Sequence, residues 1–210
     1  MSNLAPGEPA DPGLPDAVLL RRHVEGDPEA FGLLFKRHSG RLWAVALRIT
    51  CDPDDAADAL QDAMISAFRR AAGFRAESAV TTWLHRIVVN ASLDLLRRRP
   101  SGSVSWSGNP DELPAAEPGQ PADSTGAADS RLDVQAALRL LPPPQRAALV
   151  LVDMLGYSVA DASEILGVSA GTVKSRCARG RTRLLPYVSH LGARNQTAAD
   201  SVPSEQGGGG

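Results

Sequence analysis

The sequence is poor in the residues that build disulfide frameworks, metal sites and large cores. Its 210 residues include two cysteines, Cys51 and Cys177, which are far apart and form no CxxC motif. The four histidines are scattered, so we predict no disulfide, metal site or cofactor. We expect both cysteines to be buried core residues. Aromatic residues make up 4% of the chain, which predicts small helical cores in one or two small domains.

Long hydrophobic runs are also missing. The chain contains no stretch of about 18 apolar residues and no basic-then-apolar leader, so neither a membrane span nor a signal peptide is predicted. We therefore expect a cytoplasmic protein that does not insert into a membrane.

Three segments have compositions that do not favour folding, and they divide the chain. We expect a disordered N-terminus at 1–15, a flexible acidic linker at 100–129 and a disordered tail at 191–210, because these segments are rich in Pro, Gly, Ser or Ala. The folded domains then span 16–99 and 130–190. Apolar residues recur at spacings of three and four in both, without alternating β-branched runs, which predicts an all-α fold of two small helical domains.

Charge is separated along the chain, although the net charge is only −2. Residues 52–62 contain five aspartates and no base, whereas residues 174–183 contain five bases and no acid. The chain therefore has one acidic face and one basic face, although its net charge is small. Each run alone is also compatible with an ordinary solvated helix surface.

The C-terminal segment carries the signals of two consecutive short helices. Ser158, with Asp161 three residues later, forms a capping box that predicts a helix from Val159. Gly167 ends that helix, and Ser169 can cap a second one. This pattern fits a helix-turn-helix within a C-terminal four-helix domain, and a plain αα-hairpin shares the same signals.

The second of these helices favours DNA binding. Val173, Cys177 and Leu184 fall on one side of the helical wheel and form a buried stripe. The opposite side carries no carboxylate and presents Thr172, Ser175, Arg176, Arg179 and Arg183. A helix that enters the major groove needs cations for phosphates and arginine forks for base edges.

An acidic helix is predicted in the N-terminal domain, beginning near Pro53 with acids in its first turn. The wheel places Asp55, Asp58 and Asp62 on its outer side beside the apolar Ile65. Such a stripe can dock a basic partner, and a solvated surface explains it equally well.

The segment "AVTTWLHRIVVNASLDLLRRR" predicts a helix with a tryptophan on its polar side. Leu84, Ile87, Val88, Ala91 and Leu95 form the expected buried stripe. Trp83, Arg86, Asn90 and Arg97 project from the opposite side. Either the neighbouring loop 73–78 covers the indole, or the indole stacks on an unpaired base while the polar groups read the base edge. Arg97 and the two arginines after it add phosphate-binding capacity.

Together, these segments resemble the extracytoplasmic-function group of RNA polymerase sigma factors. The stretch "DAADALQDAM" resembles the helix that binds core polymerase in that family. "TTWLHRIVVNASLDLLRRR" resembles its −10 helix, and "LPPPQRAALVLVDMLGYSVADASEILGVSAGTVKSRCARGRTRL" resembles its −35 reader. The "TWLHR" and "GTVKSRCARGR" stretches are similar to those of the actinobacterial M-type subgroup.

This resemblance implies a role for each surface. Asp55, Asp58, Gln61 and Asp62 would dock the clamp coiled coil of the polymerase β′ subunit, beside Ile65. Trp83, Arg86 and Asn90, with the 74–79 loop, would capture a flipped base of the −10 element. Lys174, Ser175, Arg176 and Arg179 would contact the −35 element. The family also implies an anti-sigma factor as a further partner. Met64 departs from the aromatic residue that is common at its position in the family.

We therefore predict a sigma factor, and not an enzyme, that directs promoter-specific initiation. A self-sufficient helix-turn-helix regulator is the main alternative, and it would bind paired half-sites without polymerase. An enzyme is less favoured, because no nucleophile motif, phosphate loop or ligand cluster accompanies Asp55 and Asp58.

Overall fold

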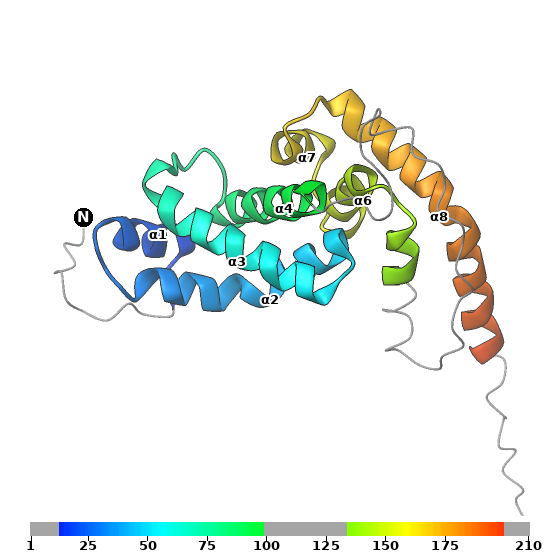
Figure 1. Cartoon of the computed structure of the whole chain (residues 1–210), viewed down its shortest axis with the longest axis horizontal. Helices are drawn as coiled ribbons and strands as arrows, with labels where there is room; N and C mark the ends of the chain where they lie inside the picture. The colour runs from blue at the N-terminus through cyan, green and yellow to red at the C-terminus, as the bar shows by residue number, and fades with distance from the viewer. Residues whose placement is uncertain (1–12, 99–133, 200–210) are drawn as a thin grey trace, which may run out of the picture.

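A computed structural model describes residues 13–98 and 134–199, with side chains up to residue 187. Helices make up both described parts, which confirms the all-α prediction. The N-terminal domain contains α1 (Asp16–Val24), α2 (Ala30–Thr50), α3 (Pro53–Arg70), the short 3₁₀ turn η1 (Ala71–Gly73) and α4 (Val80–Arg98). The C-terminal domain contains a helical segment at 134–139, α6 (Pro143–Leu149), the π-helical turn η2 (Val150–Met154), α7 (Val159–Leu166) and α8 (Ala170–Ala199) (Figure 1).

The N-terminal domain is a bundle in which α2, α3 and α4 contact one another. Small side chains allow α3 to approach its neighbours closely: Ala56, Ala59, Ala63 and Ala67 are fully buried. Leu34, Leu42 and Ile49 of α2 and Leu84 and Val88 of α4 complete this core. The alanine stripe accounts for a core that contains few aromatic residues.

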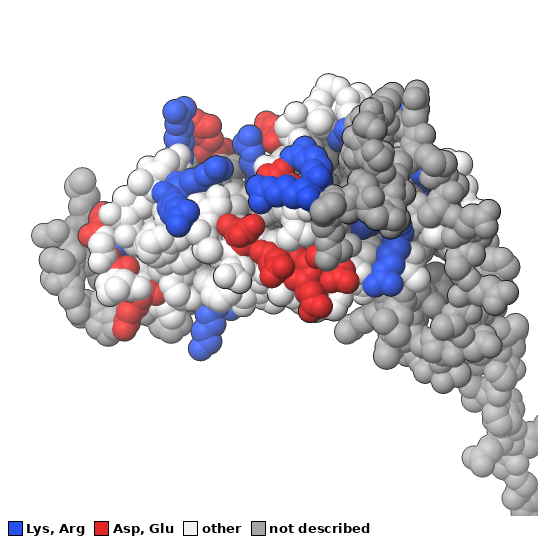
Figure 2. Space-filling model, in the orientation of Figure 1, with Lys and Arg blue, Asp and Glu red and all other residues white. Residues whose placement is uncertain are grey.

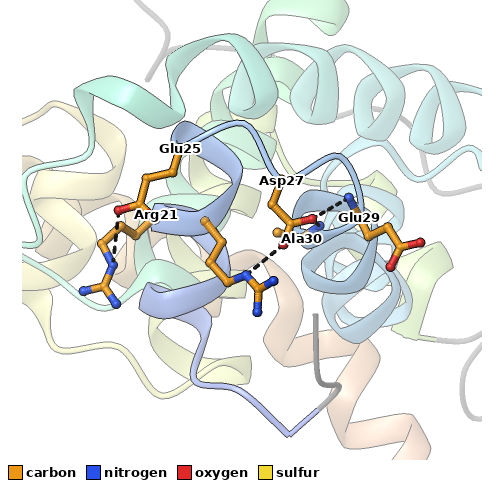
Figure 3. Close-up of polar contacts among 6 residues, drawn as sticks. Arg21, Glu25, Asp27, Glu29 and Ala30 are labelled. Carbon is orange, nitrogen blue, oxygen red and sulfur yellow. Dashed lines mark hydrogen bonds and ion pairs between the residues drawn. The ribbon is translucent and has the colours of Figure 1, made fainter. Parts of the chain in front are cut away.

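Asp27 fixes the connection between α1 and α2 (Figure 3). Its Oδ1 accepts hydrogen bonds from the backbone amides of Glu29 (2.9 Å) and Ala30 (3.3 Å). Its Oδ2 lies 2.8 Å from Nε of Arg22. The hydrogen bond from the Glu29 amide is the main cause that lowers the pKa of Asp27. Asp27 thus satisfies the first amides of α2 as a capping carboxylate does.

A tight corner joins α2 to α3. Cys51 follows the end of α2 in the left-handed conformation, with φ 61°. Asp52 then caps α3, because its Oδ1 accepts from the amides of Asp54 and Asp55 at 3.0 Å each. Pro53 occupies the first helical position, where its missing N–H costs nothing. The predicted start of this helix near Pro53 is confirmed.

The helix-turn-helix of the C-terminal domain is formed by α7 and α8, as the capping residues predict. The Asp161 amide donates to Oγ of Ser158 (3.0 Å), and the Thr172 amide donates to Oγ of Ser169 (3.1 Å). Between the helices, Gly167 adopts φ 64° and closes α7. The left-handed conformation explains why glycine stands at this turn.

Both cysteines are buried in the core, as predicted: Cys51 is 3% exposed and Cys177 is 2% exposed. Burial raises the pKa of each thiol. Neither is therefore a thiolate at neutral pH.

The two domains pack against each other, so that α4 is covered on two sides. It contacts α2 and α3 of its own domain, and α6 and α7 of the C-terminal domain. Leu84 and Val88 of the predicted stripe are buried, while Ile87, Ala91 and Leu95 are only half-buried. Three further side chains of α4 are buried: His85, Val89 and Ser92. The helical wheel did not predict them, because it assumed one buried side.

The helix α8 continues further than the sequence analysis expected. It extends to Ala199 through Pro186, whereas a disordered tail was expected from residue 191. The segment after Pro186 contains alanines and other helix-compatible residues, and the next proline is Pro203. Residues 1–12 of the N-terminal segment predicted at 1–15, the linker predicted at 100–129 and the residues from 200 onwards lie outside the described residues. No helix in the described part of the chain has the length and apolarity needed to cross a membrane.

Gly180 allows α8 to pass close to α6. A Cβ at this position would lie 2.6 Å from Cδ1 and 3.2 Å from Cγ of Leu149. Leu149 is itself buried at 3% exposure, so it has little room to move.

We predict that Gly180→Ala lowers the free energy of unfolding by about 1–3 kcal/mol, because overpacking outweighs the gain in helix propensity. Gly171→Ala on the same helix is the matched control, since its added Cβ would meet only Oγ of Ser169, at the ordinary contact distance of 3.8 Å. Urea denaturation of both variants measures the difference. Equal stability of the two variants would show that α8 and α6 do not approach in this way.

Candidate nucleic-acid interface

An exposed acidic row follows one side of α3. Asp54, Asp58 and Asp62 are all exposed, and Figure 2 shows a continuous red band over this helix. Gln61 is also exposed, and Ile65 keeps 42% of its surface accessible at the end of the row. Four of the five predicted docking residues therefore share an accessible face.

Asp55 does not lie on this face, which corrects its placement by the helical wheel. It is 3% exposed and turns inward beside the buried Ala56 and Ala59. Because α3 contacts both α2 and α4, its buried sector is wider than a single stripe. The first turn of α3 therefore carries one aspartate inward and leaves Asp54 and Asp58 outside.

The outer side of α4 carries the side chains predicted for an unpaired base. Arg86 and Asn90 are exposed, and Trp83 is half-buried. Their spacing of three and four residues places them in one row along the helix. Arg97, near the end of α4, is exposed and pairs with the carboxylate of Asp94.

Phe74 supports one side of the Trp83 ring. The two ring centroids lie 5.4 Å apart at an interplanar angle of 56°. Residues 75–79 of the same loop are exposed, and Ala76 adopts φ 56°. The loop therefore fixes the indole without burying it completely, so the two explanations given above for this tryptophan are compatible.

The outward side of α8, called here the reading face, presents bases and hydroxyl groups. Lys174 and Arg179 are exposed, and the remaining members are half-buried: Thr172, Ser175, Arg176 and Arg183. Ser175 donates to the carbonyl of Thr172 at 3.0 Å, and the hydroxyls of Ser169 and Thr172 lie 2.9 Å apart. The small polar groups thus bond locally at the start of the helix, beside the longer cationic side chains.

Arg181 has a different role, although it lies in the same basic run. Its Nε and Nη2 donate to the two carboxylate oxygens of Asp153 at 2.9 and 2.6 Å. This bidentate pair ties α8 to η2 and directs the guanidinium away from the reading face. The hydrogen bond to Asp153 raises the pKa of Arg181 further.

Three polar residues at the domain contact were not singled out by the sequence analysis: His85, Arg139 and Arg146. Arg139 and Arg146 donate to the carbonyls of Cys51 and Ile49, and Nδ1 of His85 lies 2.6 Å from the Tyr157 hydroxyl. Their signal in the sequence is weak. A histidine or an arginine on a helix is usually solvated. Here His85 and Arg146 are buried at the domain contact, whereas Arg139 stays exposed and reaches the Cys51 carbonyl from the surface.

Comparison with known proteins connects these surfaces to one family. Residues 34–101 match Sigma-70 region 2, and residues 131–184 match Sigma-70 region 4. The sigma factor SigM of Mycobacterium tuberculosis H37Rv is 49% identical over 176 residues, which cover 84% of this chain and 86% of that protein. The chain belongs to the extracytoplasmic-function sigma factors. Its similarity to SigM groups it with the M-type subgroup.

Solved structures agree with this assignment. CnrH in complex with the cytosolic domain of CnrY has a TM-score of 0.60 at 25% identity, covering 83% of this chain and 97% of that one. RpoE of Bartonella quintana, solved with the anti-sigma factor NepR, has a TM-score of 0.58 at 28% identity, covering 77% and 98%. This sigma factor therefore binds RNA polymerase and directs promoter-specific transcription initiation.

Proposed function

We propose that this sigma factor divides initiation among three surfaces: the acidic row of α3 with Gln61 and Ile65, the outer side of α4, and the reading face of α8. The observation that carries the proposal is the separation of charge. One exposed helix face is built from carboxylates and another from bases, and both belong to one chain. The carboxylate face repels DNA phosphates, so it is suited to a basic protein partner and not to DNA.

The acidic row docks the core polymerase. Asp58 and Asp62 attract a basic surface, and Ile65 supplies an apolar contact that becomes dry on binding. The clamp coiled coil of the β′ subunit is the partner that the family resemblance implies. Because polymerase supplies much of the affinity for DNA, the low net charge of the chain is compatible with promoter binding.

We predict that Asp58→Arg combined with Asp62→Arg lowers the affinity for core polymerase by at least about tenfold, because the docking face then repels its partner. Fluorescence anisotropy with purified core polymerase measures this affinity. Glu25→Arg with Glu29→Arg makes the same charge change at the exposed α1–α2 connection and serves as the control. Unchanged binding by the α3 variant would contradict the docking role.

The reading face contacts the −35 element in the major groove. Arg176 and Arg179 supply planar forks for base edges, while Lys174 and Arg183 neutralise phosphates. Thr172 and Ser175 lie in the capped first turn of α8. The amino end of this helix can therefore approach the phosphates of the DNA backbone.

We predict that Arg176→Ala with Arg179→Ala reduces −35-dependent run-off transcription by about tenfold or more, since each lost base contact costs about 1–3 kcal/mol. Core polymerase binding should stay within about twofold. The control is Arg181→Ala, which removes an arginine from the same helix but not from the reading face. A parallel loss of polymerase binding in the double variant would argue against the assignment. Tight duplex binding by the free chain would instead favour a self-sufficient regulator.

The outer side of α4 captures a flipped base of the −10 element. The Trp83 ring, supported by Phe74, offers a stacking surface, and Arg86 and Asn90 stand beside it to bond the base edge. Arg97 adds a phosphate contact. Capture of an unstacked base shifts the duplex towards the open state without bond chemistry in this subunit.

We predict that Trp83→Ala lowers the fraction of open complexes by roughly 5- to 150-fold, which corresponds to about 1–3 kcal/mol of stacking per base. Trp83→Phe should retain most of the activity. A 2-aminopurine probe in the non-template −10 strand reports the unstacked base. Trp43→Ala removes an exposed indole from α2 and controls for general effects. Normal opening by Trp83→Ala would exclude the base-capture role.

The location and the regulation of this protein follow from the same proposed role. A sigma factor acts where polymerase acts, so we place this one in the cytoplasm and assign it no enzymatic reaction of its own. CnrH was solved with CnrY, and RpoE with the anti-sigma factor NepR. We include an anti-sigma factor among the partners of this chain for that reason.

A further inference from the structure

The short helix α1 packs at the end of the bundle that leads into the proposed base-capture site. It lies where α3 passes into η1, and it contacts η1 as well as α2 and α4 (Figure 1). Leu19 and Leu20 anchor it in the core, with exposures of 0% and 2%. The match to Sigma-70 region 2 begins at residue 34, so α1 lies outside the matched stretch.

A carboxylate fixes the amino end of α1 to α2. Asp16, the first residue of α1, accepts a hydrogen bond from Nη1 of Arg37 at 2.5 Å, and its other oxygen lies 2.7 Å from Nε2 of His38. His38 is itself 7% exposed. A helix of nine residues is too short to persist alone in water. Its position therefore depends on these contacts and on the two buried leucines.

An imidazole joins the carboxyl end of α1 to the end of α3. Nε2 of His23 lies 3.2 Å from the carbonyl oxygen of Phe68, and the ring nitrogen is the donor because a carbonyl can only accept. Phe68 lies in the last turn of α3, where the carbonyls lack α-helical partners. The rings of His23, Phe31 and Phe68 also form a cluster, with centroid distances of 5.0, 4.4 and 5.2 Å. These contacts fix the turn at which α3 ends.

The backbone runs directly from this turn to the support of Trp83. Ala71 begins η1 three residues after Phe68 and is 4% exposed. The Phe74 amide donates to the Ala71 carbonyl at 3.1 Å, and the Phe74 ring lies against Trp83. On the other side of Phe74, residues 75–79 are exposed. The orientation of Phe74 therefore depends on η1 and on the elements that pack against η1.

We propose that α1 is a brace that positions the Phe74–Trp83 pair for base capture, with Asp16 and His23 as its positioning residues. The inference rests on the proposed function of Trp83. Neither positioning residue belongs to the outer side of α4, and each acts through η1 by holding Phe74 against the indole. Without the brace Phe74 turns away, and the unsupported Trp83 ring stacks on the base less well.

The environment of Trp83 in the free full-length chain tests the brace. Trp43→Phe with Trp106→Phe leaves Trp83 as the only indole, because the chain has three tryptophans. In this background His23→Ala should shift the Trp83 emission to longer wavelength and raise its quenching by acrylamide. Phe74→Ala removes the support outright and sets the full scale of both changes.

Arg21→Ala is the matched control, because Arg21 is an exposed residue of the same helix and its recorded ion pair is with Glu25. It should leave the emission unchanged. Circular dichroism checks that the helix content is retained. Asp16→Asn, a substitution of nearly equal size, makes the same test from the other end of α1 if His23→Ala does not fold. If the folded variant keeps the emission and quenching of the parent, α1 does not brace Phe74.

The consequence for initiation is measured with a 2-aminopurine probe in the non-template −10 strand. His23→Ala should lower the fraction of open complexes by about two- to fivefold, less than Trp83→Ala, because a displaced indole keeps part of its stacking surface. The affinity for core polymerase should be unchanged, since Asp58 and Asp62 are intact, whereas a general structural defect would lower both quantities. Rescue of promoter opening by His23→Gln, which restores a side-chain N–H donor, would support the positioning role further.

Normal opening by His23→Ala, in a chain where Trp83→Ala reduces opening, would contradict the positioning role. The emission measurement contains neither polymerase nor DNA, so it detects a failure of the brace by itself. A failure of the base-capture function is detected separately, when Trp83→Ala opens promoters normally.

Discussion

The burial of α4 between two layers is the constraint on which the rest of the structure depends. One side of the helix packs on α2 and α3, and another is covered by α6 and α7. Arg86 and Asn90 remain exposed along one side of the helix, and Arg97 and Arg98 are exposed at its end. Each layer that covers α4 therefore also determines which of its side chains stay exposed, and where the second domain lies relative to the first.

The chain separates its charges between two helices, and the two faces suit two different kinds of partner. Aspartates on α3 suit a basic protein surface, whereas bases on α8 suit phosphates and base edges. Asp54, Asp58 and Asp62 of α3 and Lys174 and Arg179 of α8 are exposed. Arg181 shows the contrasting case, since its pairing with Asp153 turns a base from the same run into a structural contact.

Much of the fold was predictable from local signals. Ser158 and Ser169 cap α7 and α8 as predicted, Gly167 ends α7 as predicted, and α3 begins at Pro53 as predicted. These features depend on a few neighbouring residues, so the sequence contains the information they need. The family assignment was predictable for a similar reason, because its motifs lie in contiguous stretches.

The sequence by itself determined the all-α class, the starts of α3, α7 and α8, the caps of α7 and α8, the separation of charge and the family. Only the tertiary structure decided that Asp55 turns inward, that Phe74 supports Trp83, and that His85 and Arg146 are buried at the domain contact. The physical reason is that a helical wheel describes one helix with one buried side. A helix packed on several neighbours has a wider buried sector, and its extent depends on residues that are distant in the chain.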